Sequence, residues 1–205
     1  MKLYLIRHAQ STANVRKILD TALPGPPLTE LGHQQAQSLA EKLAAEPIVA
    51  VYASYAIRAQ QTAAPLAATL AMDVQLVEGV HEVSVGELEG RGDPEALRSY
   101  AATVHPWTRG DLGVSMPGGE SGHEVHARFT TAVAELRAKH EPSAPEGAIA
   151  LVSHGGAIRL SAEWLSDNVR PELADQGLIP NTGIVELESA PGGGWRCLSW
   201  VGMPM

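Results

Sequence analysis

Short apolar runs alternate with longer segments of helical periodicity, and this alternation constrains the fold of the chain more than any other feature. The predicted strands are residues 3–6, 48–53, 74–77 and 148–153. The predicted helices are residues 29–45, 56–70, 94–103, 121–140 and 157–165. Two late strands, at 184–187 and 196–200, are joined by a glycine turn at 192–194. The pattern predicts an α/β three-layer sandwich, with helices on both faces of a mostly parallel central sheet.

Length and composition narrow the classes of protein that fit this pattern. The 205 residues show no internal repeat and no long linker, so we expect a single domain over residues 1–205. A single cysteine, Cys197, excludes an internal disulfide and a multi-cysteine metal site. The formal net charge of −8 argues against nucleic acid or an anionic membrane as a partner. A small anionic substrate still fits, since a local pocket can be basic.

The beginning of the chain carries no visible targeting segment. Its first apolar run spans only residues 3–6 before Arg7, which is too short for the core of a signal peptide. No stretch approaches the roughly 18 apolar residues of a membrane span. We therefore expect a cytoplasmic protein, the alternative being a secreted protein whose leader has been removed.

Histidines follow two of the predicted strands directly. Arg7 and His8 end the first strand, and His154 follows the fourth. Ligands of open parallel sheets bind outside the carboxyl ends of the strands, so both histidines are expected at the same edge. If the two strands are neighbours, the imidazoles face each other across one crevice.

The residue types around these histidines suit phosphate. Arg7 offers a planar fork that matches phosphate oxygens. Ser11 and Asn14 supply neutral polar side chains, and Gly155 lets backbone N–H groups approach an anion at the start of a helix. A lone histidine after a strand is more often structural, but the combination with Arg7 favours a binding function.

Two further residues are candidates for the same crevice. Arg58 lies near the start of the helix after the second strand, at the same sheet edge, although an arginine in such a helix is commonly a solvated surface residue. Glu82 lies in the loop after the third strand and is a candidate acid. His123 and His126 are three residues apart on one predicted helix, but without a third ligand they predict no metal site.

Taken in order, these motifs resemble the histidine phosphatase superfamily, which has the phosphoglycerate mutase-like fold. The motifs are Arg7-His8, Arg58 within S-x-x-x-R-A-x-Q-T-A, Glu82 followed by G-x-x-E-G at 86–90, and S-H-G-G at 153–156. The resemblance covers nearly the whole chain. One departure is Ala9, where the family most often has glycine after the histidine, so the backbone there should keep a negative φ.

The resemblance implies a mechanism and assigns roles to individual residues. His8 would attack phosphorus and form a phosphohistidine. Arg7, Arg58 and His154 would bind the phosphoryl oxygens. Glu82 would protonate the leaving alcohol. The accessory phosphate contacts would be Ser11, Asn14 and the backbone at Gly155, and no metal or other cofactor is implied.

Three functions remain open at this point. The first is a metal-independent phosphatase of the histidine acid phosphatase type, acting on a small-molecule phosphomonoester. The second is a cofactor-dependent phosphoglycerate mutase, and the third a non-catalytic protein that binds a phosphorylated ligand. The uncharged segment at 83–86 favours the phosphatase over an enzyme with a highly anionic bisphosphorylated intermediate. Exposed edge strands near the C-terminus would also permit a homodimer.

Overall fold

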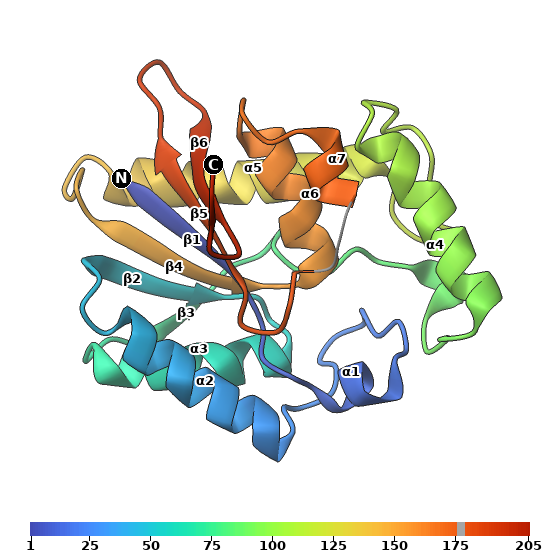
Figure 1. Cartoon of the computed structure of the whole chain (residues 1–205), viewed down its shortest axis with the longest axis horizontal. Coiled ribbons are helices and arrows are strands. Elements are labelled where there is room, and N and C mark those ends of the chain that lie inside the picture. The colour runs from blue at the N-terminus through green and yellow to red at the C-terminus, as the bar shows by residue number, and fades with distance from the viewer. Residues whose placement is uncertain (176–178) are drawn as a thin grey trace.

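A computed structural model describes residues 1–175 and 179–205, which form a sheet between two layers of helices (Figure 1). The strands are β1 (Lys2–Arg7), β2 (Ile48–Ala53), β3 (Val74–Leu76), β4 (Ala148–Ser153), β5 (Ile184–Ser189), β6 (Trp195–Trp200) and β7 (Met203–Pro204). The helices are α1 (Thr12–Arg16), α2 (Glu30–Leu43), α3 (Ile57–Thr69), α4 (Pro94–Trp107), α5 (Gly122–His140), α6 (Gly155–Leu165) and α7 (Pro171–Asp175), with a 3-10 turn, η1, at Gly86–Leu88.

The described strands follow the order β3-β2-β4-β1-β5-β6-β7. β3, β2, β4 and β1 pair in parallel, whereas β5, β6 and β7 add antiparallel pairs on the other side of β1. The α/β sandwich with helices on both faces is confirmed, and its sheet is mixed. β5 and β6 are antiparallel to each other because the chain turns back through glycines 192–194 as a hairpin, which needs no crossover helix.

The central strands are buried on both faces, which explains their continuous apolar sequence. In β1, Leu3 and Leu5 belong to the core under α5 and α6, together with Phe129. Tyr4 and Ile6 point to the opposite face, into the core under α2 and α3. Figure 1 shows these two helix pairs on opposite sides of the sheet. Both layers therefore hold β1 in place.

Helix α4 lies beyond the carboxyl ends of the parallel strands and is longer than the sequence predicts (Figure 1). Asp93 caps its first turn, and the helix continues to Trp107 instead of ending at residue 103. The reason is tertiary: Trp107 is fully buried in a separate small core, and its indole N–H donates to the carbonyl of Val114 at 2.8 Å. This packing holds the last turn of the helix despite Pro106.

Helix α6 begins immediately after β4, so its first turn lies at the carboxyl edge of the sheet beside the ends of β1 and β2. His154 is the N-cap residue of this helix. Across residues 1–175 and 179–205, none of the helices has the length and apolar character needed to cross a bilayer.

Candidate active site

The ends of β1 and β4 bring His8 and His154 together. The parallel register pairs Arg7 with Ser153, so the next residue of each strand leaves the sheet at the same level. The imidazole centroids are 5.2 Å apart, with an interplanar angle of 61°. Both side chains are buried, at 4% and 0% exposure. Neighbouring strands therefore bring the two imidazoles together as expected, with the rings in an edge-on arrangement.

The backbone fixes the tautomer of His8. Its Nδ1 lies 2.7 Å from the carbonyl oxygen of Ala9, and a carbonyl can only accept, so Nδ1 carries the hydrogen. The lone pair is then on Nε2, which accepts a hydrogen bond from Nε of Arg58 at 3.2 Å. Ala9 itself is fully buried and is absent from the non-glycine residues with positive φ, as the sequence predicted. Nε2 is therefore the ring atom that keeps a lone pair.

Arg58 connects the two histidines. Its Nη2 donates to Nδ1 of His154 at 3.2 Å and to the carbonyl oxygen of Asp20 at 3.1 Å. The guanidinium is 3% exposed, and within the described chain its Nη1 is buried without a hydrogen-bond partner. Gly25, at φ +68°, passes so close that a Cβ there would lie 2.3 Å from Nη1. Arg58 is thus a buried cation whose Nη1 makes no hydrogen bond within the described chain, although it lies 3.9 Å from Oδ1 of Asp20.

Ser54 orients His154. Because Arg58 can only donate, Nδ1 of His154 must accept, and the hydrogen of the neutral ring lies on Nε2. That Nε2 is 2.7 Å from the hydroxyl oxygen of Ser54, which accepts it. The hydroxyl also accepts from the backbone N–H of Ala56 at 3.3 Å. The second imidazole is therefore held in one tautomer by the first residue after β2.

Burial keeps both imidazoles neutral. Loss of hydration, followed by the charges of Arg58 and Arg7, lowers the pKa of His8 to about 3. Burial, followed by the charge of Arg58, lowers the pKa of His154 well below its ordinary value. The positive charge of the site consequently comes from the two arginines, and His8 is free to act as a nucleophile.

Arg7 lies against the first turn of α6. Its Nη1 donates to the carbonyl of Ile179, and its Nε is buried without a partner among the described residues. A Cβ on Gly155 would lie 3.1 Å from that Nε, so the glycine permits the close passage of the guanidinium. The donors without a partner on Arg7 and Arg58 create a local preference for an anion in a protein of net negative charge.

Glu82 occupies the N-terminus of α6. One carboxylate oxygen accepts from the N–H of Gly156 at 3.0 Å, and the other accepts from the N–H of Ala157 at 2.8 Å and of Val83 at 2.9 Å. The sequence predicted that backbone N–H groups near Gly155 would serve an anion. In the structure, the N–H groups of Gly156 and Ala157 donate to the carboxylate of Glu82 instead.

Ser11 and Asn14 form the capping box of α1. Ser11 is the N-cap residue, and Oδ1 of Asn14 accepts from both its N–H and its hydroxyl, at 3.0 and 3.2 Å. The same oxygen accepts from Nδ2 of Asn181 at 3.2 Å. Ser11 is 1% exposed and serves this local turn. Within the described residues, no hydrogen bond occupies Nδ2 of Asn14.

Three residues around the site were not predicted from the sequence. Ser54 orients His154, and Thr62 accepts from the N–H of Ala9 at 2.9 Å. Both lie in the S-x-x-x-R-A-x-Q-T-A segment, so a signal for them was present. Asn181 donates to the carbonyl of His8 at 3.0 Å, and no pattern in the sequence points to it.

The described residues of the site form no arrangement typical of a metal centre. Over residues 1–175 and 179–205, no three His, Cys, Asp or Glu side chains are placed to hold a metal ion. The donor set is instead two arginines and two neutral imidazoles, with a carboxylate at the margin. Phosphate oxygens fit such a set, because guanidinium groups bind them with paired N–H donors.

Comparison with known proteins gives concordant results. The profile of the histidine phosphatase superfamily (branch 1) matches residues 3–202. A PE-PGRS family protein of Mycobacterium tuberculosis is 36% identical over 98% of this chain, which spans only 36% of that protein. A probable phosphoglycerate mutase of an Enterobacter strain is 30% identical over 98% of this chain and 90% of its own length.

A solved structure shows the same fold. The native structure of a mycobacterial glucosyl-3-phosphoglycerate phosphatase has a TM-score of 0.81 and 27% identity, and the match covers 97% of each chain. The resemblance that the sequence motifs indicated, and the phosphoglycerate mutase-like architecture it implied, are therefore confirmed over nearly the whole chain.

Proposed function

Because the chain belongs to the histidine phosphatase superfamily (branch 1), we propose that it hydrolyses small-molecule phosphomonoesters through a phosphohistidine on His8. One observation carries this proposal. The lone pair of a buried, neutral imidazole lies beside two guanidinium groups that keep unpartnered N–H donors within the described chain. A nucleophile with unsatisfied cationic donors around it suits the transfer of an anionic group.

In the first step, Nε2 of His8 attacks phosphorus while the ester P–O bond breaks. A phosphoryl group that enters between Nε2 and Arg58 takes over the hydrogen bonds of this guanidinium and frees the lone pair. Arg7, Arg58 and His154 stabilise the charge that spreads over the phosphoryl oxygens. Glu82 gives its proton to the leaving alcohol oxygen.

In the second step, water attacks the phosphohistidine. Glu82, now ionised, takes a proton from the attacking water, and the N–P bond breaks as inorganic phosphate forms. The net reaction consumes one ester and one water and releases one alcohol and one phosphate. The two arginines supply the positive charge for both steps, so the proposed mechanism needs no metal ion. The free amide N–H groups of Asn14 provide an accessory phosphate contact.

The segment after Glu82 favours hydrolysis over the transfer of the phosphoryl group to an acceptor other than water. Val83 and Val85 are fully buried, so they add no cationic contact for a second phosphate or a carboxylate. The solved phosphatase structure supports the same assignment. The low pKa of His8, about 3, keeps the nucleophile neutral in acidic solution, which supports the histidine acid phosphatase type.

The test is phosphate release from p-nitrophenyl phosphate in the presence of EDTA. Wild type should turn over, His8→Ala should not, and His33→Ala, an exposed histidine on α2, should match wild type. Base-quenched wild type should also contain a phosphorylated fraction by intact mass, and His8→Ala should lack it. Turnover by His8→Ala would contradict the proposal. Isomerisation of phosphoglycerate that depends on a bisphosphoglycerate primer, without phosphate release, would favour the mutase.

A further inference from the structure

Glu82 lies on a segment that has few hydrogen bonds of regular secondary structure. Residues 77–93 connect β3 to α4, and the only described helical element within them is η1. A general acid must nevertheless be held closely, because misplacement by about 1 Å can cost a factor of about 10² in rate. Some other contact must therefore fix the backbone around Glu82.

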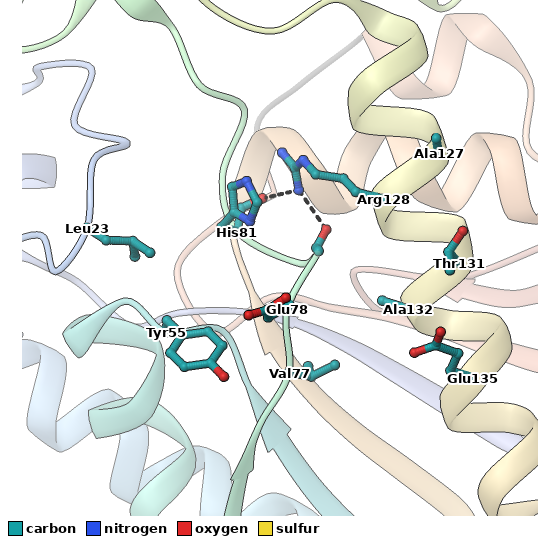
Figure 2. Close-up of a pocket in the computed structure, with 11 residues that line it drawn as sticks. Leu23, Tyr55, Val77, Glu78, His81, Ala127, Arg128, Thr131, Ala132 and Glu135 are labelled. Atoms are coloured by element: carbon teal, nitrogen blue, oxygen red, sulfur yellow. Dashed lines mark hydrogen bonds between the residues drawn. The ribbon is translucent and has the colours of Figure 1, made fainter.

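Arg128, on α5, makes that contact. Its Nη1 donates to the carbonyl oxygens of Gly79 and His81, at 2.7 and 2.8 Å. Its Nη2 donates to the carbonyl oxygen of Glu82 itself at 3.2 Å. Figure 2 shows the guanidinium reaching from α5 toward the loop, with its bonds to the first two carbonyls drawn. A single side chain thus satisfies three carbonyl groups of the segment that carries the acid.

Glu120 completes the arrangement from the other side. Its carboxylate accepts from Nε and Nη2 of Arg128 at 2.7 and 2.9 Å, in a bidentate pair. The same carboxylate accepts the N–H of Ser84 at 2.8 Å, and the backbone N–H of Glu120 donates to the Ser84 carbonyl at 3.0 Å. The backbone is therefore held immediately before, at and after Glu82.

The geometry assigns Arg128 and Glu120 a clamp that positions Glu82, and we propose that Arg128 is a positioning residue for the general acid. Every nitrogen of its guanidinium is engaged with the loop or with Glu120. The side chains of the pair are 14% and 17% exposed. A lysine could not replace this arginine, since the contacts need a planar fork with several fixed donors. The inference rests on the proposed function of Glu82.

The experiment compares two leaving groups. p-Nitrophenol departs with little protonation, whereas the alcohol of glycerol 2-phosphate needs a proton from the acid. Arg128→Met should lower kcat/KM for glycerol 2-phosphate by roughly 10²-fold and kcat/KM for p-nitrophenyl phosphate by less than about 10-fold, because kcat/KM reports the steps up to formation of the phosphohistidine and not its hydrolysis, which both substrates share. Glu82→Gln should show the same selectivity. The double variant should lose no more than Glu82→Gln alone, because both changes remove one function.

A matched control lies on the same helix. Arg137 also pairs with a carboxylate, that of Glu141, and donates to a backbone carbonyl, that of Gly194, but it holds the β5–β6 turn. Arg137→Met should therefore affect both substrates equally. An equal loss on both substrates in Arg128→Met, with Glu82→Gln still selective, would overturn the positioning role alone. Equal losses in Glu82→Gln would overturn the acid assignment, and the clamp with it.

Chemical rescue separates positioning from simple destabilisation. A cavity of about 810 Å³, lined in part by Arg128, His81, Tyr55 and Glu135, gives solvent access to the guanidinium (Figure 2). Guanidinium ions at roughly 10–100 mM should enter the space left in Arg128→Ala and restore part of the glycerol 2-phosphate activity, as sodium ions should not. Guanidinium weakens folded proteins, so a variant that is merely unstable would lose activity instead.

Amide hydrogen exchange gives a readout that does not depend on turnover. The N–H groups of Gly156 and Ala157 are bonded to the Glu82 carboxylate and should be protected in wild type. In Arg128→Met these two amides should exchange faster while the amides of β1 keep their protection. Unchanged protection at Gly156 and Ala157 would contradict the clamp.

Discussion

Acid should destabilise this protein through His8, because the folded state keeps this side chain neutral. Burial and the neighbouring arginines lower its pKa from 6.5 to about 3, whereas the unfolded chain titrates near the ordinary value. Between these values the unfolded state binds a proton that the folded state does not. The stabilising contribution is therefore fully present above about pH 6.5 and is lost as the pH falls toward 3.

The size of the effect follows from the same two values. Each pH unit within the window changes the free energy of unfolding by about 1.4 kcal/mol per such histidine. Between pH 6 and pH 4.5 the contribution of His8 is about 2 kcal/mol, which is a sizeable part of the roughly 5–15 kcal/mol that a domain possesses. His154 acts in the same direction, because burial also lowers its pKa.

Urea unfolding at a series of pH values, followed by circular dichroism, measures this contribution. Between pH 6 and pH 4.5, the free energy of unfolding of His8→Asn should fall by about 2 kcal/mol less than that of wild type. Carboxylates titrate in both proteins, so their contribution cancels when the two pH dependences are compared. The control His33→Asn, on the surface of α2, should follow wild type. Parallel curves for His8→Asn and wild type would refute the argument that a neutral buried imidazole underlies the acid sensitivity.

Three substitutions test other contacts. Gly156→Ala places a Cβ 2.8 Å from Oε1 of Glu82 and should displace this carboxylate. The kcat for an unactivated ester should then fall by roughly 10²-fold, and an unchanged kcat would contradict the close packing. Ser54→Ala leaves a buried N–H of His154 without its acceptor and should lower the free energy of unfolding by about 1–3 kcal/mol in urea titrations. Leu66 is fully buried in α3, so Leu66→Ala should lower the free energy of unfolding by about 2–5 kcal/mol while kcat at low temperature is retained. A smaller loss in urea titrations would mean that the core closes over the gap.

The central strands were predictable because burial on both faces requires a continuous run of apolar residues. β2 and β4 have the predicted bounds, and β1 extends one residue further at each end. The apolar runs end in polar residues at the carboxyl edge, so the meeting of His8 and His154 followed from the parallel register. The capping box of α5 likewise follows a local S-x-x-E pattern, that of Ser121 and Glu124.

The remaining features depend on tertiary contacts that no local pattern encodes. α1 has only five residues and exists through its capping box, so nothing in the sequence showed that the hydroxyl of Ser11 is taken up by this turn. Arg128 looks like any arginine of an amphipathic helix until the fold places three loop carbonyls against it. Asn181 reaches the carbonyl of His8 across 173 positions of sequence.

His8 and Glu82 belong to parts of the molecule that should fail at different stages of denaturation. β1 is hydrogen-bonded to β4 on one edge and to β5 on the other, so His8 leaves its place only when the sheet itself opens. The Glu82 segment depends on side-chain contacts and two helix amides, and such segments open at a lower free-energy cost than the core. Mild heat or urea would therefore lower the rate at which unactivated esters phosphorylate His8 before it lowers that rate for activated esters. The substrate range of this protein would narrow before its fold is lost.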